Sequence, residues 1–170
     1  CPGINPTFVK TKNNCYIMKK TFFICTILVC IFTNIRAQWK PVGNRIVTPW
    51  TEKVDVTSVL PEYPRPIMER NEWKNLNGLW EYAITDVGKS CPKQFDGQIL
   101  VPFAVESALS GVGKAVGKEK ELWYCRTFNI PSSWKNKKIL LHFGAVDWKA
   151  DVWVNKVKVG QHTGGFTPFS

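Results

Sequence analysis

Several features that identify common classes of enzyme and membrane protein are missing from this sequence. Its apolar run at 22–32 is shorter than the 20 or so residues that a transmembrane helix needs. The chain contains no Gly-x-Ser-x-Gly elbow, no P-loop and no Gly-x-Gly-x-x-Gly motif. Its 170 residues are also too few for a complete (β/α)₈ barrel, which takes about 250. These absences exclude an α/β-hydrolase site, a dinucleotide-binding motif and a whole barrel from this stretch of sequence.

Acidic residues are absent from the first 37 positions, which hold five basic side chains. This segment therefore carries half of the formal net charge of +10, and 18 basic and 13 acidic residues remain after it. The remainder has no stripe of Lys and Arg and no motif of a nucleic-acid-binding domain. We expect a mildly basic, solvated surface and no nucleic-acid partner.

The amino-terminal segment has the pattern of a secretory signal. Met18, the first methionine, is followed by Lys19 and Lys20 and then by the apolar residues 22–32. A basic stretch before an apolar run of about 7–15 residues is typical of a secretory signal peptide. We predict a signal peptide over 18–37, cleaved after Ala37, with residues 1–17 as upstream sequence. Export to the periplasm or the cell exterior, with no membrane anchor, follows from this prediction; the alternative is a buried strand or helix at 21–32.

Potential metal ligands are scarce after position 37. Cys91 and Cys125 are the only cysteines there, and they lack the close spacing that zinc ligands show. In an oxidising compartment they could form one disulfide, and otherwise they remain two free thiols. We predict no metal and no cofactor.

Proline punctuates residues 39–70 and disfavours both helix and central strand in this stretch. We predict an extended arm over 38–63, with Trp39 and Trp50 as its anchors on the domain. The prolines are Pro41, Pro49, Pro61, Pro64 and Pro66.

A β pattern begins near Trp73, because apolar residues then alternate with polar ones between Gly and Pro breaks. Asn155-Lys156 is typical of a tight hairpin turn, although Lys replaces the usual Gly. No amphipathic helical window exceeds about ten residues, so we predict an antiparallel β-sandwich or barrel. The expected strands are 78–84, 98–103, 122–128, 138–143, 150–155 and 157–160, with a long loop over 104–120.

The candidate binding groups are few. His142 is out of phase with the apolar residues of its expected strand, whereas His162 lies in the terminal loop. Most of the eight tryptophans are expected in the core, above all Trp80, Trp123 and Trp153. Trp148 stands beside Asp147 at the start of a strand and is the better candidate for a binding rim. Most other acids fit a solvated surface.

Six ordered segments of the chain resemble the amino-terminal domain of glycoside hydrolase family 2, which contains β-galactosidases, β-glucuronidases and β-mannosidases. The resemblance covers roughly residues 64–170. The segments that carry it are 65–66 with 73–80, then 101–111, 122–128, 141–148, 152–155 and 159–169.

The resemblance implies a jelly-roll (galactose-binding-like) antiparallel β-sandwich over 64–170, called the sugar-binding domain. A jelly roll has about eight strands, so we expect this one to be incomplete at its C-terminus. In the family the two catalytic glutamates lie in a later barrel and act by a retaining mechanism, so we expect no catalytic residue here. By the same resemblance, loops of this domain reach the barrel mouth. The implied substrate-binding positions are Glu106, Asp147, Trp148 and His162.

The expected function is therefore that of the leading domain of an exported β-glycosidase, inactive by itself, whose partner is a carbohydrate substrate. A stand-alone carbohydrate-binding module is the alternative, and it requires a complete sandwich with an exposed aromatic platform. A structural or protein-interaction sandwich is a third reading. The sequence specifies no oligomeric state.

Overall fold

The computed structural model of the chain describes residues 39–170. The predicted signal peptide and the upstream segment 1–17 lie outside these residues. Every paired strand runs antiparallel to its neighbour, and the helical turns within 39–170 are all of the 3₁₀ type. The predicted all-β antiparallel class is therefore confirmed. No helix between 39 and 170 combines the length and apolarity needed to cross a bilayer.

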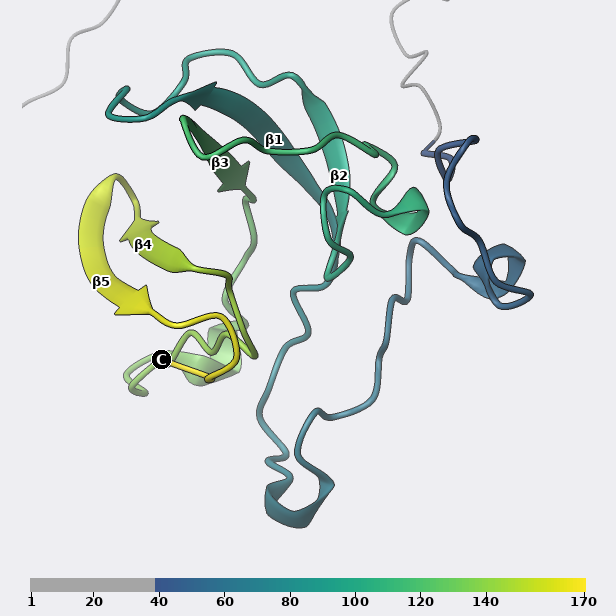
Figure 1. Ribbon diagram of the computed structural model, residues 1–170. Helices are drawn as coiled ribbons and strands as arrows, with labels where there is room; N and C mark the ends of the chain where they lie inside the picture. Colours follow the sequence, from purple (N-terminus) through teal and green to yellow (C-terminus); the bar gives the residue numbers. More distant parts are fainter. Residues whose placement is uncertain (1–38) are drawn as a thin grey trace, which may run out of the picture. The chain divides into compact units, whose positions relative to one another are not determined.

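The chain divides into two compact units, which meet in sequence between Cys125 and Arg126. The first unit holds a three-stranded sheet with the strand order β2-β1-β3 (Figure 1). Its elements are η1 (Thr51–Lys53), η2 (Pro66–Met68), β1 (Gly78–Asp86), β2 (Gly97–Val101), η3 (Ala108–Ser110) and β3 (Lys120–Cys125).

The core of the first unit lies on one face of this sheet. Trp80, Tyr82 and Ile84 alternate along β1 and therefore share that face. Tyr82 packs in a buried cluster with Ile99 of β2 and with residues of the 104–117 loop. Apolar burial of this kind supplies most of the stability of a sheet face. The cluster comprises Tyr82, Ile99 and Val105, with Trp80, Ile84, Val101, Val112, Val116 and Leu122 packed against it.

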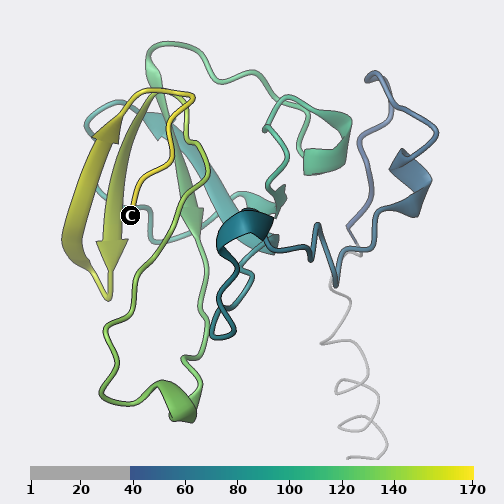
Figure 2. The ribbon, with the colours of Figure 1, turned by 90° about the horizontal axis from the view of Figure 1, so that it is seen from below.

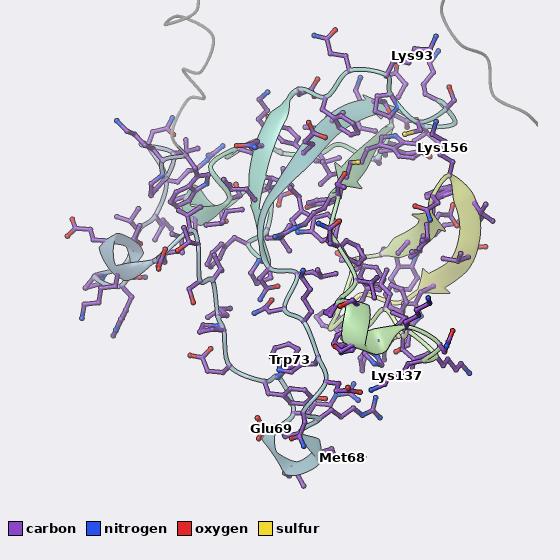
Figure 3. The ribbon with its side chains drawn as sticks, turned by 180° about the vertical axis from the view of Figure 1, so that it is seen from behind. Met68, Glu69, Trp73, Lys93, Lys137 and Lys156 are labelled. Carbon is purple, nitrogen blue, oxygen red and sulfur yellow. The ribbon has the colours of Figure 1, made fainter. Side chains whose placement is uncertain are left out.

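The amino-terminal arm is irregular and includes η1, and of its two predicted anchors Trp39 contacts another part of the first unit. Trp39 donates its indole N–H to the Ser110 carbonyl oxygen at 3.3 Å. Trp50 is 67% exposed, so its prediction as an anchor is wrong. Farther along, the Asn75 side chain donates to the Leu60 carbonyl oxygen at 2.8 Å and so joins the two ends of residues 61–74. This segment contains η2 and projects away from the three-stranded sheet in Figure 1 and toward the viewer in Figure 2. Figure 3 labels Trp73, Met68 and Glu69 in it.

The second unit contains η4 (Ser132–Trp134) and a two-stranded hairpin of β4 (Lys149–Val154) and β5 (Val157–Thr163). Asn155 and Lys156 both have positive φ, at 50° and 69°, which is the geometry of a type I′ hairpin turn. Figure 3 labels Lys156 at the tip of this hairpin. The predicted turn is therefore confirmed, and β5 runs three residues beyond its predicted end.

A β-bulge between Val152 and Trp153 alters the side-chain pattern of the hairpin. Lys158 forms an ion pair with Asp151 at 2.7 Å, and its ammonium lies 5.8 Å from the centroid of the Trp153 ring. Trp153 is therefore an exposed surface residue, and its prediction as a core residue is wrong.

Residues 138–143 do not form the predicted strand. Of the residues in this stretch, Phe143 alone has a β-bridge partner among the described residues, and that partner is Phe169. Ile139 and Leu140 are exposed. A period-two pattern sorts side chains onto two faces, but a strand also needs a neighbouring backbone to satisfy its N–H and C=O groups.

Candidate functional site

Three of the four predicted site residues occupy the two ends of the hairpin that lie away from its turn. Asp147 and Trp148 come directly before β4, and His162 lies near the end of β5, where it pairs with Ala150. The antiparallel register therefore brings these ends together within the second unit. The Asp147–Trp148 peptide bond is cis.

The loop that follows β5 is fastened to the segment before β4. The Gly164 N–H donates to the Trp148 carbonyl oxygen at 2.7 Å. A Cβ atom at Gly165 would lie 2.5 Å from Oδ1 of Asp147, so the loop backbone lies directly against this carboxylate. Only glycine fits at position 165 without a shift of the loop or of Asp147.

His162 braces this loop from its other side. Its Nε2 lies 2.9 Å from Oγ1 of Thr167, and its ring stacks on Phe169 with 4.4 Å between centroids. Phe169 in turn stacks on Phe143 at 4.7 Å. The side chain of His162 thus contacts residues of the same loop and holds that loop in place. His142, which the sequence assigned to the solvent side, is exposed and contacts the hydroxyl of Ser170.

Two large aromatic rings project from this fastened pair of segments. Trp148 is 66% exposed, and Phe166 is 98% exposed. Asp147, which lies against the backbone of Gly165, is also exposed. The sequence did not predict Phe166 as a candidate, because it lies in the terminal loop and belongs to no recognised motif. One signal was present: Phe166 directly follows two glycines, where the backbone can take a tight path.

Glu106, the fourth predicted residue, belongs to the first unit and therefore to a separate constellation. It is exposed at the start of the 104–117 loop, next to the buried Val105. Burial raises the pKa of Tyr124, and the negative charge of Glu106 raises it further. Tyr124 also meets the Trp80 ring edge-on, with 6.5 Å between centroids. This unit thus offers a carboxylate and a phenol as hydrogen-bonding groups.

The loop that carries Glu106 is organised around one fully buried hydroxyl. Ser110 Oγ donates to a carbonyl oxygen, with Ser107 at 2.8 Å and Val105 at 3.0 Å as the available acceptors. It accepts from the N–H groups of Val112 at 3.0 Å and Gly113 at 3.3 Å. A buried hydroxyl with its hydrogen-bonding capacity used in this way fixes the path of the backbone around it.

We name residues 39–45 the strap, because they bind across this loop. The Val42 N–H donates to the Ala108 carbonyl oxygen at 3.0 Å, and Arg45 Nη2 donates to that of Gly113 at 2.5 Å. The Trp39 indole covers Gly111, where a Cβ atom would lie only 2.4 Å from Nε1. The strap therefore holds the loop that presents Glu106.

Cys91 and Cys125 are free thiols, the first exposed and the second half-buried. Burial raises the pKa of Cys125, and the charges of Glu81 and Cys91 raise it further. Across residues 39–170, no three or more His, Cys, Asp or Glu side chains gather into a group that could hold a metal ion. The second unit offers a ligand the Asp147 carboxylate and the exposed rings of Trp148 and Phe166. The first unit offers a ligand the Glu106 carboxylate and the Tyr124 phenol.

Comparison with known families finds a match in the carboxy-terminal part of the described chain. Residues 112–170 match the family model described as "Glycosyl hydrolases family 2, sugar binding domain". The matched range includes β3, β4 and β5 and three of the four candidate site residues.

Curated relatives point the same way. The chain is 29% identical over 113 residues to a β-glucuronidase of Paenibacillus borealis, and 30% identical over 123 residues to the β-glucuronidase of Felis catus. Each alignment covers 63% of this chain and 19% of the relative. A β-galactosidase of Thermoanaerobacter pseudethanolicus is 31% identical over 99 residues, which is 56% of this chain and 13% of that protein. The chain thus spans less than a fifth of the length of these relatives.

Proposed function

We propose that the complete protein is an exported glycosidase that hydrolyses β-glycosides with retention of configuration, and that residues 112–170 are part of its glycosyl hydrolase family 2 sugar-binding domain. In this proposal the described residues bind carbohydrate and shape one wall of the pocket, and the reacting carboxylates lie elsewhere in the complete protein. The observation that carries the proposal is the match of residues 112–170, supported by relatives named β-glucuronidase and β-galactosidase.

In this proposal each candidate residue has a role. The Asp147 carboxylate accepts hydrogen bonds from sugar hydroxyls, and the Trp148 indole offers an apolar face to the C–H groups of a sugar ring. Glu106 is a separate candidate acceptor within the first unit. His162 acts through Thr167 and Phe169 as a positioning residue for the loop.

Retention requires a pair of carboxyl groups about 5–5.5 Å apart, one as nucleophile and one as acid and base. We assign this pair to the rest of the complete protein, because the matched part of this chain is described as sugar binding.

The decisive experiment reads the source gene beyond the Ser170 codon and expresses the complete product. We expect hydrolysis of an aryl β-glucuronide or β-galactoside, with the β-anomer as the first product in proton NMR. A stop codon directly after Ser170, or a complete product that cleaves none of the aryl β-glycosides offered, contradicts the glycosidase proposal. An α-anomer as first product contradicts the retaining mechanism alone.

Export is tested separately. Lys19 and Lys20 before the apolar residues 22–32 support it. Amino-terminal sequencing of the protein recovered from the periplasm or medium should begin at or within two residues of Gln38. Recovery of uncleaved protein in the cytoplasm contradicts this part of the proposal.

A stand-alone carbohydrate-binding module is a second candidate, favoured by the exposed rings of Trp148 and Phe166. It predicts saturable micromolar binding of a glycan by residues 38–170 alone. The glycosidase proposal predicts no binding tighter than millimolar by this part in isolation.

A further inference from the structure

The most exposed aromatic side chain of the second unit has no role in the function proposed so far. Phe166 is 98% exposed, and it follows Gly165, whose backbone touches the Asp147 carboxylate. Leaving a phenyl ring in water forgoes the favourable free energy of its burial. Gly164 and Gly165, the two residues before Phe166, contact Trp148 and Asp147, and exposed aromatic side chains on segments that meet at a polar group are typical of a binding site.

The backbone beneath this ring is held before any ligand arrives. Gly164 is hydrogen-bonded to Trp148, Thr167 contacts His162, and Phe169 pairs with Phe143. These contacts flank Phe166 on both sides in sequence. A side chain displayed from a backbone that is already ordered binds with a smaller entropy cost than one on a free loop.

The surrounding charges show which part of a substrate fits here. Within residues 126–170 the acids are Asp147 and Asp151, and Asp151 is paired with Lys158. One exposed carboxylate cannot perform retaining cleavage, which needs two. Asp147 with two aromatic faces can instead hold a sugar through its hydroxyls and its apolar face.

We propose that Phe166, together with Trp148 and Asp147, forms a subsite for a sugar residue next to the one that is cleaved, so that the protein prefers an oligosaccharide substrate. This inference rests on the proposed glycosidase function. Aromatic contacts with a neutral sugar are the same in the ground state and in the transition state. Their loss therefore raises KM and leaves kcat nearly unchanged.

The test compares Phe166→Ala with the wild type in the complete protein, using two substrates that share the cleaved sugar. One is a β-linked oligosaccharide, and the other is the β-glycosyl fluoride, whose leaving group is a single atom. We expect KM for the oligosaccharide to rise about tenfold, with kcat within twofold, and both constants for the fluoride to stay unchanged. Phe166→Trp should restore the oligosaccharide KM.

Phe128→Ala is the matched control, because Phe128 is also an exposed phenylalanine of the second unit, at 36%. It should leave both substrates unaffected. The proposal is overturned if Phe166→Ala raises KM equally for both substrates, or for neither. It is also overturned if Phe166→Ala lowers the melting temperature by several degrees, since the ring then packs against another part of the protein.

Failure of the glycosidase proposal is a different result, namely a wild-type protein that hydrolyses no glycoside. In that case the same variants are titrated with the oligosaccharide by calorimetry. Saturable binding that Phe166→Ala weakens about tenfold upholds the subsite, and the absence of saturable binding overturns it.

Discussion

Lys156 has a backbone conformation that lysine rarely adopts. Its φ of 69° places Cβ close to the following carbonyl oxygen, which costs an L-residue roughly 1–2 kcal/mol. The type I′ turn nevertheless forms, because it matches the twist of the two strands that it joins. The turn therefore retains strain that glycine would relieve.

Lys156→Gly should stabilise the hairpin by about 1 kcal/mol. Amide hydrogen exchange in β4 and β5 should accordingly slow about fivefold. Lys156→Ala is the control: it removes the long side chain but keeps Cβ, so it should give no such gain. Equal slowing in both variants would locate the effect in the charge and not in the backbone.

The pKa of Tyr124 responds to its neighbours in a predictable direction. Burial is the larger cause of its rise, and the charge of Glu106 is the smaller. Glu106→Gln should therefore lower the Tyr124 pKa part of the way toward its ordinary value of 10.0. Ultraviolet titration of the phenolate, with Tyr124→Phe subtracted, measures this shift. An unchanged titration shows that the Glu106 carboxylate lies too far away to act.

The same shift has a consequence for stability. Because the folded pKa lies above the unfolded one, Tyr124 contributes its full stability below about pH 10 and loses it as pH rises through the folded value. The wild type should therefore lose more stability than Tyr124→Phe between neutral pH and strongly alkaline pH. Urea midpoints at several pH values measure the difference. Parallel losses in the two proteins contradict the linkage.

At the scale of elements, the strap and the 104–117 loop should behave as one piece. Gly111 and Gly88 have nearly the same φ, 77° and 79°, but only at Gly111 does a Cβ atom meet another group, the Trp39 indole. Gly111→Ala should therefore cost about 2 kcal/mol more than Gly88→Ala, which has backbone strain alone. Urea midpoints compare the two, and in a Trp39→Ala background the difference should disappear. Persistence of the difference there means that the strap does not contact Gly111 in solution.

Proteolysis tests the contact between the strap and the 104–117 loop by a second method. Trp39→Ala removes a hydrogen bond and the cover over Gly111, so trypsin should cut at Lys114 and Lys118 about tenfold faster. Trp50→Ala, at an exposed tryptophan of the same arm, should leave the rate unchanged. Equal rates in the two variants argue that the loop is held by Ser110 alone.

Local pattern predicted β1, β2, β3 and the β4–β5 hairpin, because each combines alternation with a turn residue whose conformation is encoded locally. The failure at 138–143 has the opposite cause: Ile139, Leu141 and Phe143 have the spacing of one strand face, yet a strand depends on a partner that the pattern does not specify. Phe166 was missed for a similar reason, since the contact of Gly165 with Asp147 joins segments that are far apart in the sequence. Asp147 and Trp148 could be chosen as candidates because their position before a strand is a local feature, and their role in binding stays a prediction.

For the molecule as a whole, the exposed apolar surface is the feature with the clearest consequence. Ile46, Ile67 and Phe166 are each almost completely exposed, and the two sheets have three and two strands. Small sheets with much exposed apolar surface are seldom stable alone. Residues 38–170 expressed alone should therefore show no cooperative calorimetric transition and poorly dispersed amide resonances. A sharp transition with well-dispersed resonances would show that these residues fold independently.

The strap also constrains the order in which the protein can fold. Its indole hydrogen bond joins Trp39 to Ser110 across 71 positions, whereas the connection between β1 and β2 comprises only residues 87–96. Closing so long a loop costs conformational entropy before any contact repays it. A chain made from its amino terminus presents Trp39 long before the ribosome releases Ser110. The first residues of the strap must therefore wait unbound for their partner, and the strap should close only after the three-stranded sheet has formed.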